Sequence, residues 1–252
     1  MKIGAVIQAR MGSTRLPGKV MKEVCGRPLL SYLIERVRRS NLVDAIVVAT
    51  SDLDSDQKIA DFARGQNVGV FQGSETDVLD RYYQAALAWS LDLVIRITAD
   101  CPLLDNQAID EFVGAFQKER DLDYMVTAQS WPEGYDMEIF KFKVLEKAWN
   151  EAVRPLEREH VTPYIRGHPE LFHIKRLECP HGDLSWMRIT VDEAADFKVV
   201  KAIIEHLSPK NASFALNDII GFLQARPDLQ DINKHIIRNE GLQKSLKEEG
   251  AG

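Results

Sequence analysis

The sequence is poor in cysteine, in long apolar runs and in net positive charge. Its three cysteines are odd in number and far apart, which excludes a disulfide scaffold and predicts reduced thiols in a cytoplasmic protein. No apolar run approaches the roughly 18 residues that span a bilayer, and the first residues lack a signal-peptide pattern, so we expect no membrane association. The net charge of −6 argues against a nucleic-acid partner, because such proteins present a basic face.

Short apolar segments alternate with segments of helical periodicity over the first half of the chain. Such alternation, with strands that are apolar on both faces, is typical of a mainly parallel sheet covered by helices on both sides. We therefore predict one α/β domain over residues 1–252, built as three α/β/α layers. The expected strands are 2–7, 45–50, 68–71, 93–98 and 124–127.

The alternation of apolar strands and helices changes at about residue 129. Alternating polar and apolar residues predict a half-exposed strand at 136–140, and helices are expected at 143–152 and 157–167. Residues 129–185 are interpreted as a subdomain inserted before a final core strand at 187–191. The charged tail from Asn239 is expected to fray.

A basic loop follows the first predicted strand. It carries Arg10, Arg15 and Lys19 without any acidic residue. Five residues separate Gly12 from Gly18-Lys19 and no Ser or Thr follows, so the loop is not a Walker A motif, and it also lacks the dinucleotide glycine pattern. Ligands in doubly wound sheets lie beyond the carboxyl ends of the strands. The loop therefore favours a triphosphate site built on Arg and Lys, and the alternative is a solvated basic turn.

Two aspartates stand at later strand ends. Asp100 follows the strand at 93–98 and precedes Pro102, a position that suits a Mg²⁺ ligand beside substrate phosphates. The alternative is a turn cap. Asp192 follows the expected strand at 187–191 and is either a second carboxylate ligand or an ordinary helix N-cap.

Other motifs are weaker indications of a functional site. The segment Gly73–Arg81 suits either a nucleotide base or ribose, or an ordinary capping box. His160 lies in a polar cluster that is either functional or a surface helix. Cys179-Pro180-His181 is too tight for a zinc half-site. The D-x-D triplets at 52–54, 54–56 and 121–123 are interpreted as solvated loops.

The basic loop resembles the A-R-x-x-S-x-R-L-P-x-K signature of the CMP-sugar synthetases, the cytidylyltransferases for KDO and acylneuraminate. Gln8 stands where those enzymes commonly have proline. The chain is more similar to the spore coat polysaccharide biosynthesis protein F group, whose ordered motifs are all present: Gly-Ser-Glu-x-Asp-Val-Leu-x-Arg, Ile-Thr-Ala-Asp-Cys-Pro, Gly-x-Asp-x-Glu, Arg-Glu-His-Val-Thr-Pro-Tyr-Ile and Arg-x-Thr-Val-Asp.

The resemblance implies a Rossmann-like nucleotide-diphospho-sugar transferase fold. It implies transfer of CMP from CTP to a sugar acid, release of pyrophosphate, and a place in surface polysaccharide biosynthesis. It also implies a homodimer that pairs through residues 129–185. Two alternatives stay open: a glycosyltransferase of the same fold with a D-x-D metal site, and a non-catalytic nucleotide-binding homologue.

The resemblance also assigns roles by position. Asp100 and Asp192 match paired Mg²⁺ ligands, while Glu138 and His160 match the sugar side. Arg10, Lys19 and Asp100 are expected to be catalytic. The residues expected to bind the nucleotide are Ala9, Arg10, Gly12, Ser13, Arg15, Lys19, Thr76, Asp77 and Arg81.

Overall fold

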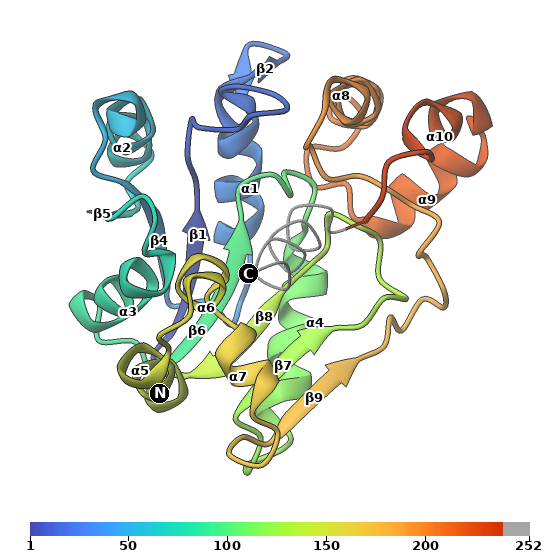
Figure 1. Cartoon of the computed structure of the whole chain (residues 1–252). Helices are drawn as coiled ribbons and strands as arrows, with labels where there is room; N and C mark the ends of the chain where they lie inside the picture. Colours follow the sequence, from blue (N-terminus) through green and yellow to red (C-terminus); the bar gives the residue numbers. More distant parts are fainter. Residues whose placement is uncertain (239–252) are drawn as a thin grey trace.

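The computed structural model describes residues 1–238, which build a central seven-stranded sheet with helices on both faces (Figure 1). Six strands run in one direction, and only β8 is antiparallel to its neighbours β6 and β7. The predicted mainly parallel α/β fold is therefore confirmed. In sheet order the strands are β5 (Gly69–Gly73), β4 (Ala45–Ser51), β1 (Ile3–Gln8), β6 (Leu93–Thr98), β8 (Glu138–Lys141), β7 (Tyr124–Thr127) and β9 (Ile174–Leu177).

Side chains of the central strands alternate between two apolar layers, as the pleat of a strand requires. In β1, Ala5 and Ile7 join one buried cluster, and Val6 joins the other. The first cluster lies against α1 (Leu29–Arg38), α2 (Gln57–Gly65), α4 (Asn106–Gln117), α8 (Ala194–Leu207), α9 (Leu216–Gln224) and α10 (Pro227–Asn233). The second contains residues of α3 (Val78–Ala88), α5 (Phe142–Glu151) and α7 (Pro163–Gly167), and α6 (Pro155–His160) packs against α3.

Two 3-10 helices and a two-stranded ribbon connect the longer helices and strands. A 3-10 helix η1 (Lys19–Met21) precedes the two-stranded ribbon of β2 (Glu23–Val24) and β3 (Arg27–Pro28), and η2 (Asp54–Asp56) precedes α2. Across residues 1–238, no helix combines the length and the apolar composition that a bilayer crossing demands. The three cysteines are unpaired.

Three expected elements differ from the structure. The strand predicted at 187–191 is absent: its backbone bonds to two loops, and one isolated bridge joins Glu133 and Arg188. The strand predicted as half-exposed at 136–140 is β8, which is buried because it lies inside the sheet between β6 and β7. The range 157–167, predicted as one helix, holds two short helices, α6 and α7. Val161, at a positive φ of 72°, follows the end of α6, and Pro163 begins α7.

Residues 129–185 contribute two strands, β8 and β9, to the central sheet. Because residues 187–191 form no strand, the structure describes no core strand between residues 186 and 238. Its role in pairing two copies of the chain stays a prediction. The tail from Asn239, which the sequence predicts to fray, lies outside the described residues.

Candidate active site

The basic loop after β1 is folded by its own backbone and by a buried acid. The carbonyl of Met11 accepts hydrogen bonds from the amides of Ser13 and Gly18, at 2.9 and 3.0 Å. The Met11 amide donates to Oδ1 of the buried Asp56 at 2.7 Å. Gly18 has a φ of 66°, a left-handed conformation that favours glycine, and directly precedes η1. These contacts direct Lys19 toward the sheet edge.

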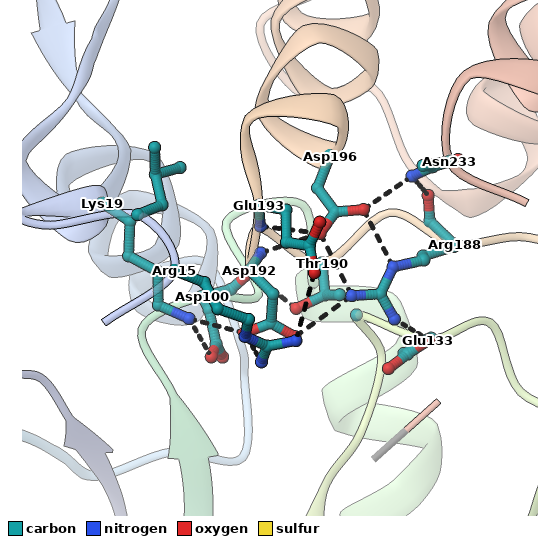
Figure 2. A network of polar contacts seen from close by, with 12 residues as sticks. Arg15, Lys19, Asp100, Glu133, Arg188, Thr190, Asp192, Glu193, Asp196 and Asn233 are labelled. Atoms are coloured by element: carbon teal, nitrogen blue, oxygen red, sulfur yellow. Dashed lines mark hydrogen bonds and ion pairs between the residues drawn. The ribbon is translucent and has the colours of Figure 1, made fainter. Parts of the chain in front are cut away.

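Lys19 joins the two aspartates that the sequence singles out (Figure 2). Its Nζ lies 2.8 Å from Oδ2 of Asp100 and 2.8 Å from Oδ1 of Asp192. Arg15 Nη2 lies 3.2 Å from the same Asp192 oxygen. Asp100 and Asp192 lie far apart in sequence, so the fold brings three predicted site residues, Lys19 included, into one cluster.

The protonation of this cluster follows from burial and from the paired charges. Burial alone would lower the pKa of Lys19, but the charges of Asp100 and Asp192 outweigh it and raise that pKa. Burial alone would raise the pKa of Asp100, but the charge and hydrogen bond of Lys19 bring it down to about 2. Lys19 is therefore charged and Asp100 ionised at neutral pH.

Backbone contacts explain why the two aspartates meet. The Asp100 carbonyl accepts the Val191 amide at 2.8 Å and the Thr190 hydroxyl at 3.1 Å. The Ala99 amide donates to the carbonyl of Gln8, at the end of β1. The segment before Asp192 is thus bonded to the loop after β6, and that loop is bonded to the start of the basic loop.

The carboxylate pair suits a magnesium ion. Asp100 and Asp192 each direct one oxygen at the same point, where Lys19 now lies. Mg²⁺ prefers one or two carboxylates together with phosphate oxygens and waters. Within residues 1–238, no three His, Cys, Asp or Glu side chains gather into a complete metal cage. This donor set therefore fits an ion that arrives with substrate phosphates.

Two cavities meet at the carboxylates. The first, of about 470 Å³, lies over the basic loop and is called here the loop cavity. The second, of about 390 Å³, lies over β6, β7, β8 and β9 and is called the acceptor-side cavity. Arg15, Thr98, Asp100 and Asp192 line both cavities. Two molecules bound in these cavities would therefore meet at Asp100 and Asp192.

The residues expected to bind the nucleotide divide into those that line the loop cavity and those that line neither cavity. Asp77 caps α3 by accepting the Asp80 amide at 2.9 Å and is paired with Arg158. Arg81 is fully buried and donates to the Ser74 carbonyl at 2.9 Å. Neither these two nor Thr76 lines either cavity, and their contact with a nucleotide stays a prediction. The six that line the loop cavity are Ala9, Arg10, Gly12, Ser13, Arg15 and Lys19.

Both residues expected on the sugar side line the acceptor-side cavity. Glu138 is buried, lies 2.6 Å from Arg96 Nη1, and accepts hydrogen bonds from the hydroxyls of Thr162, at 2.7 Å, and Tyr124. Burial alone would raise the pKa of Glu138, but the charges of Arg96 and Arg166 and the hydroxyl hydrogen bonds outweigh it, so the pKa falls. Burial also lowers the pKa of His160, which favours a neutral imidazole at pH 7.

A group of polar residues to which the sequence assigns no role lies behind Asp192. Arg188 binds Glu133, Asp192 and Asp196, and Asn233 donates to Asp196 (Figure 2). Arg188 belongs to the Arg-x-Thr-Val-Asp motif, so a signal for it was present.

The turn before β8 offers a test of how tightly this segment is held. Gly134 has a φ of 110°, and a Cβ added there would lie 2.6 Å from the backbone nitrogen of Thr190. Since backbone atoms cannot move aside as a flexible side chain does, we expect Gly134→Ala to lower the free energy of unfolding by about 3 kcal/mol. Urea denaturation measures this change.

A matched control lies in α4. A Cβ on Gly114 meets no atom within 4 Å, so Gly114→Ala is expected to change the stability by no more than about 1 kcal/mol, in the stabilising direction. Equal stability of the Gly134→Ala variant and the wild type would contradict the tight packing of this turn on residues 189–190.

A basic loop and a pair of carboxylates at the carboxyl edge of a mainly parallel sheet, with two cavities meeting at them, define a nucleotidyltransferase site. The cytidylyltransferase family model matches residues 5–220. The chain therefore belongs to the cytidylyltransferase family.

Individual relatives agree with this assignment. The chain is 34% identical over 230 residues to the spore coat polysaccharide biosynthesis protein SpsF of Bacillus subtilis, covering 88% of this chain and 94% of that protein. It is 30% identical over 189 residues to a 3-deoxy-manno-octulosonate cytidylyltransferase of Hydrogenovibrio crunogenus, covering 74% and 69%. A solved cytidylyltransferase from Leptospira borgpetersenii is similar with a TM-score of 0.87 and 32% identity, covering 95% of this chain and all of that one.

Proposed function

We propose that this cytidylyltransferase transfers CMP from CTP to a hydroxyl group of a sugar acid, with release of pyrophosphate and with a requirement for Mg²⁺. The observation that carries the proposal is the junction of the two cavities at Asp100 and Asp192. A basic cavity on one side suits a triphosphate, and a second cavity on the other side suits an acceptor. The reacting oxygen and the α-phosphate would meet at this junction.

The residues of the loop cavity then have distinct tasks. Arg10 and Arg15 offer forked donors for phosphate oxygens, and Lys19 offers a point charge. The acceptor oxygen forms a bond to the α-phosphorus with loss of its proton, and the bond to the β-phosphate oxygen breaks. Asp100 and Asp192 would hold Mg²⁺, which neutralises the phosphates and stabilises the leaving pyrophosphate when it is bound. Positioning and charge neutralisation supply most of the catalysis in such transfers.

The acceptor-side cavity suits an acid. Arg96, Glu138, Val126 and Arg176 lie opposite one another on adjacent strands, so their side chains share one face of the sheet. Glu138 neutralises Arg96. Arg176 at the sheet edge and Arg166 on α7 also line the cavity, and neither makes an ion pair within the part of the chain that the structure describes. These two arginines favour a carboxylate or another anionic group on the acceptor.

The biological setting is part of the same proposal. The Bacillus subtilis relative is named for spore coat polysaccharide, and the Hydrogenovibrio relative for a sugar acid, 3-deoxy-manno-octulosonate. From these two relatives we infer that the present protein activates a sugar acid in the cytoplasm, and that this sugar is used in a surface polysaccharide. Unpaired cysteines and the lack of a membrane-crossing helix in residues 1–238 are compatible with this setting.

A pyrophosphate-release screen tests the proposal. The four ribonucleoside triphosphates are each combined with Mg²⁺ and a panel of sugar acids, sugar phosphates and neutral sugars. The expected result is release with CTP and at least one sugar acid. Release that requires UTP or a neutral sugar would contradict the proposed substrates, and CTP binding without release under any acceptor would favour a non-catalytic homologue.

Arg176 provides a test of acceptor recognition. Arg176→Met is expected to raise the KM for the sugar acid about tenfold through the loss of one charged hydrogen bond, with the KM for CTP unchanged. Steady-state kinetics with each substrate varied in turn measure both constants. Arg120→Met removes an exposed arginine that lines neither cavity and serves as the control. An equal rise in both KM values would show that Arg176 does not act on the acceptor alone.

Dimerisation through residues 129–185 is also proposed. Val153 and Leu171 are exposed apolar side chains within this range, and burial of such groups in an interface is favourable. Light scattering coupled to size-exclusion chromatography tests the mass in solution, and a single species of one chain would overturn the dimer.

A further inference from the structure

Arg188 lies behind the carboxylate pair, on the side of Asp192 that faces away from Lys19 (Figure 2). We propose that Arg188 is a positioning residue for nucleotidyl transfer, which fixes the rotation of the Asp192 carboxylate and leaves one of its oxygens for the reacting phosphates and their metal. This inference rests on the proposed function. It goes beyond that function because it assigns a task to a buried side chain that lines neither cavity.

The guanidinium of Arg188 makes ion pairs with three carboxylates. Its Nε lies 2.8 Å from Asp196 Oδ1 and its Nη2 lies 3.1 Å from Asp196 Oδ2, which makes a two-point contact. The same Nη2 lies 3.2 Å from Asp192 Oδ2, and Nη1 is paired with Glu133. Only the planar fork of arginine can make these contacts at once, because lysine offers a single point charge.

The partner that holds this fork is itself fixed. Asp196 is fully buried and accepts the amides of Asp192 and Glu193, each at 3.0 Å. Asn233 on α10 donates to Asp196 at 2.9 Å and to the Arg188 carbonyl at 3.0 Å. The main chain at Asp192 and the guanidinium of Arg188 are therefore anchored to the same carboxylate, and the last described helix contributes to that anchor.

This arrangement divides the two oxygens of Asp192 between two tasks. Oδ2 is held by Arg188, whereas Oδ1 faces Lys19 and Arg15 at the junction of the cavities. Without Arg188 the carboxylate could rotate about its last bond and offer either oxygen, or both, to the junction. The expected consequence is a weaker and less ordered metal site with an otherwise intact sheet.

A double-mutant cycle separates this task from a purely structural one. We would measure the affinity for Mn²⁺ in the presence of CTP by electron paramagnetic resonance, for the wild type, Arg188→Lys, Asp192→Asn and the double variant. Arg188→Lys keeps the charge and loses the fork, and is expected to weaken Mn²⁺ binding about 30-fold. If Arg188 acts through Asp192, the double variant should bind no more weakly than Asp192→Asn alone.

The control is Arg36→Lys, the same change at another buried arginine, which lines neither cavity and donates a hydrogen bond to the Phe214 carbonyl at 2.9 Å. Its Mn²⁺ affinity is expected to stay within about threefold of the wild type, below the tenfold change usual for a support residue. Two outcomes would overturn the positioning role: a double variant whose loss of Mn²⁺ affinity is the product of the two single losses, or equal losses in Arg188→Lys and Arg36→Lys. Absence of Mn²⁺ binding by the wild type would also overturn it, whereas Mn²⁺ binding without pyrophosphate release would overturn the proposed function alone.

Discussion

Asp100→Asn is expected to reduce the rate of pyrophosphate release from CTP by about 10³-fold. The side chain keeps its size but loses the charge that Asp100, with a pKa of about 2, carries at neutral pH. This carboxylate lines both cavities, so its charge acts where the acceptor oxygen and the phosphates meet. Lys19 keeps Asp192 as a partner, so we expect the stability to change by only about 1 kcal/mol.

A control variant makes the Asp100 experiment specific. Asp123→Asn removes the last acid of the D-x-D triplet at 121–123, a carboxylate that is paired with Lys141 and lines neither cavity. Its activity is expected to match the wild type, whereas a glycosyltransferase that used this triplet would lose activity. Undiminished Mg²⁺-dependent turnover by Asp100→Asn would show that the metal assignment is wrong.

Lys19→Met is expected to lower kcat by about 10²-fold, because one cation that stabilises charge on the phosphates is lost while the methylene stem is kept. It also removes the shared partner of Asp100 and Asp192. The two carboxylates are mostly buried, so we expect the free energy of unfolding to fall by about 1–2 kcal/mol. Pyrophosphate-release kinetics and urea denaturation measure the two effects.

The matched control for Lys19 is three residues further along the chain. Lys22 lies over the ring of Phe197 and lines neither cavity, so Lys22→Met removes a charge from the same region without entering the site. Its kcat is expected to equal that of the wild type. Similar losses in both variants would indicate a general electrostatic effect instead of a contact between Lys19 and the phosphates.

The basic loop and Asp100 were predictable because their signals are local. Apolar strands with helices between them indicate a parallel sheet, and the carboxyl ends of its strands meet at one edge. Arg10, Lys19 and Asp100 each follow such a strand, and all three line the loop cavity. The sequence left the role of Asp192 open between a metal ligand and a helix N-cap. The structure places Asp192 beside Lys19.

The errors arise where partners are distant in sequence. Glu138 stands in an alternating pattern that indicates a half-exposed strand, but β8 lies inside the sheet, and Arg96, 42 residues earlier, neutralises the buried carboxylate. Ile189 and Val191 have the apolar spacing of a strand and are buried, yet their amides bond to the loops at Glu133 and Asp100. No local pattern specifies such pairings.

The supporting network behind Asp192 was missed for the same reason. Asn233 contacts Arg188 across 45 residues and comes from α10, a short helix whose apolar pattern shows nothing of its contact with the site. The arrangement of Arg188 on three acids is a property of the folded chain. Only the position of Arg188 within the Arg-x-Thr-Val-Asp motif indicated that it has a task.

The most direct test of the central claim is to follow a radioactive α-phosphate of CTP during a reaction with a sugar acid and Mg²⁺. An acceptor oxygen that attacks at the junction of the cavities should receive the labelled phosphate as part of CMP, while the released pyrophosphate stays unlabelled. Label that remains in free nucleotide while the acceptor is consumed, or label that leaves with the released phosphates, would contradict nucleotidyl transfer at Asp100 and Asp192.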